Sequence, residues 1–141
     1  MKNRYIERLL KEWETYGKII IAADYDDTLN PWNFNNQERC DLVIRQIIMA
    51  QKVGAYVVIH TACSPDRYEE ITKYLESRGL KIDSINKNPI DLPYGRDGAK
   101  IYANIFLDDR AGLDEALHIL SSARNMYFER NLALKQNDVE F

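Results

Sequence analysis

Residues 19–29 read IIIAADYDDTL, and they are the most informative part of the chain about its fold. Its first five residues are apolar at every position rather than at alternate ones, which is typical of a parallel strand covered on both faces. Two carboxylates, Asp24 and Asp26, follow two residues apart, so both can face one pocket where the strand ends. Like charges at close quarters repel, and the simplest group that offsets the repulsion is a divalent metal ion. The stretch therefore predicts a buried strand that leads into an acidic site.

Helices and strands alternate along the rest of the chain. Helical spacing of apolar residues, capping residues and glycine stops predict helices over residues 5–16, 37–53, 64–79 and beyond Gly112. Apolar runs predict strands over residues 19–23, 55–59, 80–85 and 105–107. Ser64 is expected to cap the third helix, residues 86–99 are expected to form one long loop, and the polar C-terminal end is expected to fray. This alternation predicts an α/β fold with a doubly wound, Rossmann-like parallel sheet in three layers (α/β/α), which binds ligands at the carboxyl ends of its strands.

The length and composition of the chain disfavour several classes of protein. A chain of 141 residues suits one domain, and its net charge of −3 disfavours a large nucleic-acid footprint. Cys40 and Cys63 form no CxxC motif and no disulfide framework, so we expect two reduced thiols. No apolar stretch approaches the ~18 residues of a membrane span, and the N-terminus lacks the apolar segment of a signal peptide. We therefore expect a soluble, cytoplasmic protein without a membrane partner.

Polar residues close the other predicted strands as well. The second strand ends in His60 and Thr61, and the last ends in Asp108 and Asp109. Two acidic pairs, each following an apolar strand, would supply oxygen ligands to one site, and such ligands with several waters suit Mg²⁺. His60 is one position away from Thr61 and should point to the opposite face, so we expect it to be packed.

In order and spacing, these residues resemble the haloacid dehalogenase superfamily of phosphotransferases, in its compact form without a large cap. The family's first motif, a hydrophobic strand followed by DxDx(T/V), matches Asp24 to Thr28. Its second motif, a Thr or Ser closing the next strand, matches Thr61, and its fourth, an acidic pair after the last strand, matches Asp108 and Asp109.

The resemblance covers the core of the chain and implies a single domain over residues 1–141. That domain would consist of an N-terminal helix (1–17), a catalytic core (19–112) and a C-terminal helical segment (113–141). Neither insertion point of the family holds a cap, because the segment between Leu29 and Ala62 is filled by one helix and its strand, and the second point, the loop over residues 86–99, is too short for a domain. An open site implies an extended substrate that covers itself, or closure by another subunit of a homo-oligomer.

The resemblance also implies a Mg²⁺-dependent phosphomonoester phosphatase. Asp24 would attack phosphorus to form an aspartyl-phosphate, and Asp26 would act as general acid and base. Mg²⁺ would be held by Asp24, the backbone carbonyl of Asp26, and Asp108 or Asp109. Thr61 would donate a hydrogen bond to a phosphoryl oxygen. The phosphorylated substrate could be a small molecule, a nucleotide or the end of a macromolecule.

The family's third motif, a lysine that balances charge near the nucleophile, has two candidates. Lys100 is favoured over Lys87 because compact members carry a basic residue shortly before the strand that ends in Asp-Asp-Arg-Ala. Two arginines, Arg67 and Arg110, also lie close to strand exits and could meet phosphate.

Two aromatic residues, Trp32 and Phe34, follow the first acidic motif on a turn-rich loop. They could form a flap over the site or pack beneath it, and the sequence favours neither.

Two other functions compete with hydrolysis. A signalling receiver domain also uses Asp, Thr and Lys, but its acidic pair comes first and its accepting Asp closes a middle strand. A binding domain that had lost turnover is disfavoured because Asp24 and Asp26 are both intact.

Overall fold

The structure, a computed structural model, describes residues 3–88 and 101–139, the last five of these by their backbone alone. In this part of the chain the helices are α1 (Arg4–Tyr16), α2 (Gln37–Gln51), α3 (Tyr68–Ser77) and α4 (Leu113–Val139), with a short 3-10 helix, η1 (Pro65–Arg67), before α3. The strands are β1 (Ile19–Asp24), β2 (Ala55–His60), β3 (Ser84–Ile85) and β4 (Ile105–Leu107). None of the described helices is both long and apolar enough to cross a membrane.

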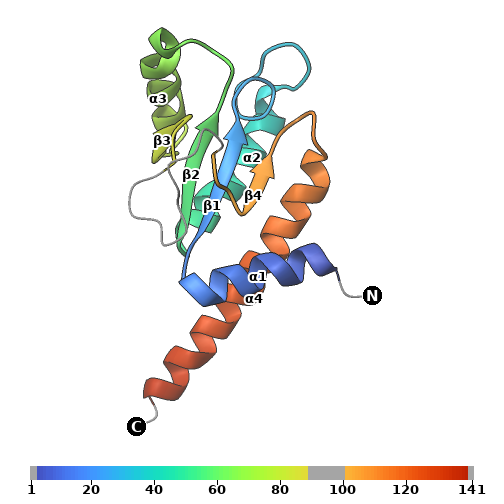
Figure 1. Ribbon diagram of the computed structural model, residues 1–141, viewed down its shortest axis with the longest axis vertical. Helices are drawn as coiled ribbons and strands as arrows, with labels where there is room; N and C mark the ends of the chain where they lie inside the picture. The colour runs from blue at the N-terminus through green and yellow to red at the C-terminus, as the bar shows by residue number, and fades with distance from the viewer. Residues whose placement is uncertain (1–2, 89–100, 140–141) are drawn as a thin grey trace.

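All four strands are parallel and follow the order β3-β2-β1-β4. The chain moves outward from β1 through β2 to β3 and then returns to the other side of β1 for β4 (Figure 1). This reversal places a topological switch point between the carboxyl ends of β1 and β4, which is where open α/β sheets bind ligands. The predicted α/β class with a parallel sheet is confirmed, and the arrangement is consistent with a Rossmann-like three-layer fold.

The central strand is buried along its whole apolar length. Each of its first five residues is buried, on the odd and on the even side of the strand alike, as the unbroken apolar run predicts. Below its amino end α1 crosses α4 (Figure 1). Trp13 is fully buried there: its indole Nε1 donates to the carbonyl of Val53 at 2.8 Å, and its ring stacks on Tyr127 at 5.1 Å. These contacts hold α1 against α4 and against the turn before β2.

Three local expectations need correction. Ser64 precedes η1 but makes no capping hydrogen bond, because its hydroxyl donates to the carboxylate of Asp66 instead. The third strand covers only Ser84–Ile85 rather than residues 80–85, since the amide of Val57 on β2 donates to the side chain of Asp83 instead of to a backbone carbonyl. The last helix continues to Val139, beyond the point where its polar composition suggested fraying.

Other expectations are confirmed or lie outside the described residues. Gly79, which follows the C-cap residue Arg78 of α3, adopts φ +88°, the left-handed conformation that ends a helix. Cys40 and Cys63 are both free thiols. The predicted loop over residues 86–99 falls largely outside the described residues.

Candidate active site

The chain turns sharply where β1 ends, and the turn separates the acidic side chains from an aromatic one. The carbonyl of Tyr25 accepts hydrogen bonds from the amides of Leu29 (2.9 Å) and Asn30 (3.0 Å). The Tyr25 ring points into the core, where it is 2% exposed and meets Tyr74 edge-on at 6.0 Å. Because side chains alternate along an extended chain, its two acidic neighbours emerge on the opposite side.

An open pocket of about 560 Å³ lies at the switch point, at the carboxyl ends of β1 and β4. It is lined by Asp24, Asp26, Asp27, Trp32, Asn33, Phe34, Asp108, Asp109 and Arg110. Both acidic pairs singled out in the sequence therefore line one pocket, although they are far apart in the sequence and follow different strands. A pocket with a few converging polar groups is the default location of an active site.

The ionisation of Asp24 is opposed by its surroundings. Burial raises the pKa of Asp24, the negative charge of Asp108 raises it further, and that of Asp26 adds a smaller contribution. Hydrogen bonds from the Thr28 hydroxyl and the Tyr25 amide counteract part of this effect, but the pKa remains above its usual range. Any cation bound among these carboxylates would relieve the repulsion.

Thr28 joins the ends of the two strands. Its hydroxyl donates to Oδ2 of Asp24 at 3.1 Å and accepts from the amide of Asp109 at 2.9 Å, and the residue is fully buried. Sequence reasoning gave Thr28 no role beyond completing the first motif. The hydrogen bonds show that its hydroxyl holds the loop after β4 against the nucleophile candidate on β1.

We expect Thr28→Val to destabilise the protein by about 1–3 kcal/mol, because it leaves the Asp109 amide without its partner in a buried site. Urea unfolding monitored by circular dichroism would measure the change. Thr28→Ser is the matched control, since it keeps the hydroxyl while removing only the methyl group. Equal stability of the Val and Ser variants would show that the hydroxyl does not hold this junction.

The two carboxylates after β4 have different surroundings. Oδ1 of Asp109 accepts a hydrogen bond from Nδ2 of Asn35 at 2.6 Å, and the same amide group donates to the carbonyl of Asp27 at 2.6 Å. Oδ1 of Asp108 accepts from the amide of Arg110 at 2.9 Å, and the charge of Asp108 is the one that acts on Asp24. The negative charge of Asp108 therefore acts on the nucleophile candidate, whereas Asp109 is tied to the loop after β1.

The carboxylate of Asp27 holds the loop after β1 in shape by accepting hydrogen bonds from the amides of residues 32–35. Asp27 adopts φ +63°, and its Oδ1 accepts from these four consecutive amides, those of residues 32–34 at 3.0 Å each and that of Asn35 at 3.2 Å. Burial opposes its ionisation, but these amide hydrogen bonds outweigh burial and lower the pKa of Asp27. Trp32 and Phe34 stand on this loop and line the pocket, at 61% and 80% exposure. They therefore do not pack beneath the site.

Arginines are the cations at the site in the described part of the chain. Nη1 of Arg67 lies 3.9 Å from Oδ2 of Asp26, and Arg110 lines the pocket. Lys87 is exposed and is not among the lining residues, whereas Lys100 lies outside the described residues. The sequence missed the pairing of Arg67 with Asp26 because the arginine follows β2 and reaches the site only across the fold.

Thr61 lies at the same sheet edge but does not line the pocket. It follows His60, which pairs with Asp24 across the ladder. Its main chain is held by Asn86, whose side chain accepts from the Thr61 amide at 2.9 Å and donates to the Thr61 carbonyl at 2.7 Å. The expectation that His60 is packed is wrong: His60 is exposed, because it is the last residue of β2 and lies at the carboxyl edge of the sheet, beyond the buried residues 57–59.

The oxygen atoms at the pocket fit a hard cation. Within the described residues, no group of three or more His, Cys, Asp or Glu side chains forms a ready metal cluster. The predicted ligand set differs from such a cluster, because it combines two carboxylates with a backbone carbonyl. Oδ1 of Asp26 is buried and has no hydrogen-bond partner within the described part of the chain, and the donor set consists of oxygens alone, as Mg²⁺ prefers.

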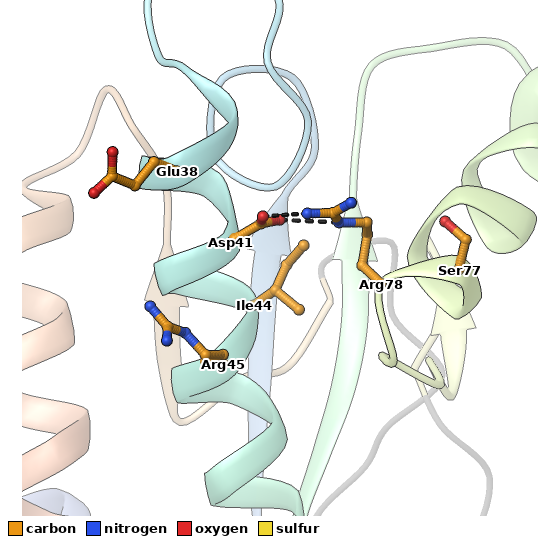
Figure 2. Close-up of a pocket in the computed structure, with 6 residues that line it drawn as sticks. All are labelled: Glu38, Asp41, Ile44, Arg45, Ser77 and Arg78. Atoms are coloured by element: carbon orange, nitrogen blue, oxygen red, sulfur yellow. Dashed lines mark hydrogen bonds and ion pairs between the residues drawn. The ribbon is translucent and has the colours of Figure 1, made fainter.

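A second depression lies between α2 and α3 (Figure 2). Asp41 accepts hydrogen bonds from Arg78 there, one of them from Nε at 3.0 Å, and this pairing lowers the pKa of Asp41. Glu38 and Arg45 point away from the pair in Figure 2. The ion pair bridges two helices and neutralises its own charge, so this depression does not show the converging carboxylates of the pocket at the switch point.

No family model and no curated protein matches this chain. Among solved structures, the chain is similar to a conserved protein from Bacteroides thetaiotaomicron, with a TM-score of 0.54 and 21% sequence identity. The similarity covers 66% of this chain and 77% of the other. At this level of identity the similarity supports the fold and nothing further.

Proposed function

We propose that this protein is a Mg²⁺-dependent phosphomonoester phosphatase of the haloacid dehalogenase type. The observation that carries the proposal is the convergence of Asp24 and Asp26 with Asp108 and Asp109 in one pocket at the switch point of the sheet. Burial first, and then the neighbouring carboxylates, raise the pKa of Asp24, so the charged pocket costs stability. Phosphoryl transfer would use these carboxylates directly.

Two of the carboxylates have distinct roles in the proposed reaction. Oδ of Asp24 attacks phosphorus, and the bond between phosphorus and the ester oxygen breaks as Asp26 gives that oxygen a proton. Asp26 then removes a proton from a water molecule that attacks the phosphorus of the aspartyl-phosphate. Inorganic phosphate leaves, and Asp24 is regenerated as a carboxylate.

The remaining groups would bind Mg²⁺ and balance the charge of the phosphate. Asp24, the carbonyl of Asp26, and Asp108 are the proposed Mg²⁺ ligands, with Asp109 as the alternative to Asp108. Bound Mg²⁺ would offset the repulsion between these carboxylates and an anionic phosphate ester. Thr61 is proposed to donate to a phosphoryl oxygen once substrate is bound, and Lys100 stays the predicted charge-balancing lysine, with Arg67 as a cation already beside Asp26.

Hydrolysis of p-nitrophenyl phosphate with and without Mg²⁺ tests the proposal. We expect turnover to require Mg²⁺ and to stop when EDTA is added. Asp108→Asn should raise the Mg²⁺ concentration for half-maximal rate at least about tenfold, because it removes a charged ligand, whereas Asp109→Asn should raise it less. Metal-independent turnover would contradict the mechanism, and the absence of turnover under all conditions would favour a phosphate-binding or receiver-like domain.

A further inference from the structure

Two aromatic side chains stand exposed at the rim of the pocket. Phe34 is the most exposed large apolar side chain in the described part of the chain, and Trp32 is 61% exposed. Both line the same pocket as the nucleophile candidate Asp24. Aromatic side chains exposed beside a polar site are typical of ligand recognition, because their burial on binding releases water from a large apolar surface.

The loop that carries these rings is held in shape before any ligand binds. The four amides of residues 32–35 all donate to one carboxylate oxygen of Asp27. Asn35 then ties the loop to Asp109 across the pocket. A platform that is already ordered loses little conformational entropy on binding, so its apolar surface contributes more fully to affinity.

Arg67 connects the platform to the reacting groups. Its guanidinium lies over the Trp32 ring, 5.9 Å from the ring centroid, and its Nη1 is 3.9 Å from the carboxylate of Asp26. A guanidinium stacked on an aromatic ring keeps its charge available at its edge. The ring platform and the proposed proton donor are thus within the span of one side chain.

We propose that Trp32 and Phe34 stack against the base of a nucleoside monophosphate whose phosphate lies at Asp24. This inference rests on the proposed function and names its substrate class. The pocket, at about 560 Å³, is within the range of small-ligand sites, roughly 300–1,000 Å³. Its cations in the described part of the chain are two arginines among several carboxylates, which suits one phosphate rather than a polyanion.

Adenosine 5′-monophosphate and ribose 5-phosphate test the proposal, because they share the phosphate and the sugar and differ only in the base. Binding is measured in the presence of Mg²⁺ to Asp24→Asn protein, which should not turn either ester over, by calorimetry and by tryptophan fluorescence. Stacking should make adenosine monophosphate bind about 5- to 150-fold more tightly. The emission change should come from Trp32, because Trp13, the other tryptophan, is buried against Tyr127.

Matched variants separate stacking from general apolar contact. In the same background, Trp32→Leu should reduce the ratio of the two affinities to near one, whereas Trp32→Phe should keep most of it because a ring remains. Phe34→Leu should lower the ratio as well. All three changes lie on exposed side chains, and melting curves would verify that the variants fold.

The proposal would be overturned if the Asp24→Asn protein with Trp32 and Phe34 unchanged bound the two esters with equal affinity, or bound neither. A 5′-phosphorylated oligonucleotide that bound more tightly than adenosine monophosphate would overturn the assignment to a single nucleotide. A different result would contradict the proposed function alone. In that case adenosine monophosphate would still bind in a manner that depends on Trp32, but the protein with Asp24 intact would release no phosphate from it.

Discussion

Asp24→Asn is expected to reduce the hydrolysis of p-nitrophenyl phosphate to background while raising the melting temperature of the metal-free protein. The loss of activity follows because an amide cannot form the aspartyl-phosphate. The gain in stability follows because the variant removes a charge that is half-buried and repelled by Asp108 and Asp26. The amide oxygen can still accept the hydrogen bond from Thr28.

The sign of the stability change depends on pH. The pKa of Asp24 is higher in the folded than in the unfolded chain, so the folded state binds its proton more readily. The contribution of Asp24 to stability therefore falls as pH rises from its unfolded to its folded pKa, and the cost is complete above the folded pKa. In EDTA at pH 7 we expect Asp24→Asn to melt about 2–4 °C higher than wild type, with the difference shrinking toward acidic pH.

Asp27→Asn is the matched control for this measurement, because it removes a carboxylate three residues along the chain. The pKa of Asp27 is lowered in the folded state, so its ionised form stabilises the protein above its unfolded pKa, and this contribution is lost as pH falls through the folded pKa. Asp27→Asn should therefore lower the melting temperature at pH 7. A destabilising Asp24→Asn, or one that retains turnover, would contradict the role assigned to Asp24.

Asp26→Asn is expected to slow the formation of the aspartyl-phosphate by a factor that depends on the leaving group. General acid catalysis contributes about 10²- to 10⁴-fold, and an alkoxide needs the proton far more than p-nitrophenolate does. Rapid-quench measurement of the first turnover isolates this half of the reaction. We expect a loss in that range for an alkyl phosphate and a clearly smaller loss for p-nitrophenyl phosphate.

Asp41→Asn serves as the control for the loss of one negative charge, because Asp41 lies in the groove between α2 and α3 (Figure 2) and not at the pocket. It should leave the first turnover of both esters unchanged. If Asp26→Asn slowed both esters equally, Asp26 would act in binding or positioning, and the proton donor would have to be another group.

Much of the scaffold of the site follows from local sequence. An apolar residue at every position of residues 19–23 requires cover on both faces, so β1 had to be an inner strand of a parallel sheet. The period of two then places Asp24 and Asp26 on one side and Tyr25 on the other. Acidic residues directly after β4 could likewise be assigned to the carboxyl edge, because parallel strands all end there.

Which of these groups meet depends on long-range contacts that local sequence does not show. The hydrogen bond from Asp109 to Thr28, and the approach of Arg67 to Asp26, join segments that no local pattern relates. Periodicity reports whether a residue faces the core, but its partner depends on strand order and on how far each neighbouring strand extends. His60 illustrates the limit of periodicity, since its alternation with Thr61 suggested packing, yet it is exposed at the carboxyl end of β2. The acidic end of a buried strand can thus be inferred from local sequence, whereas the order of the strands in the sheet brings the second acidic pair into the same pocket.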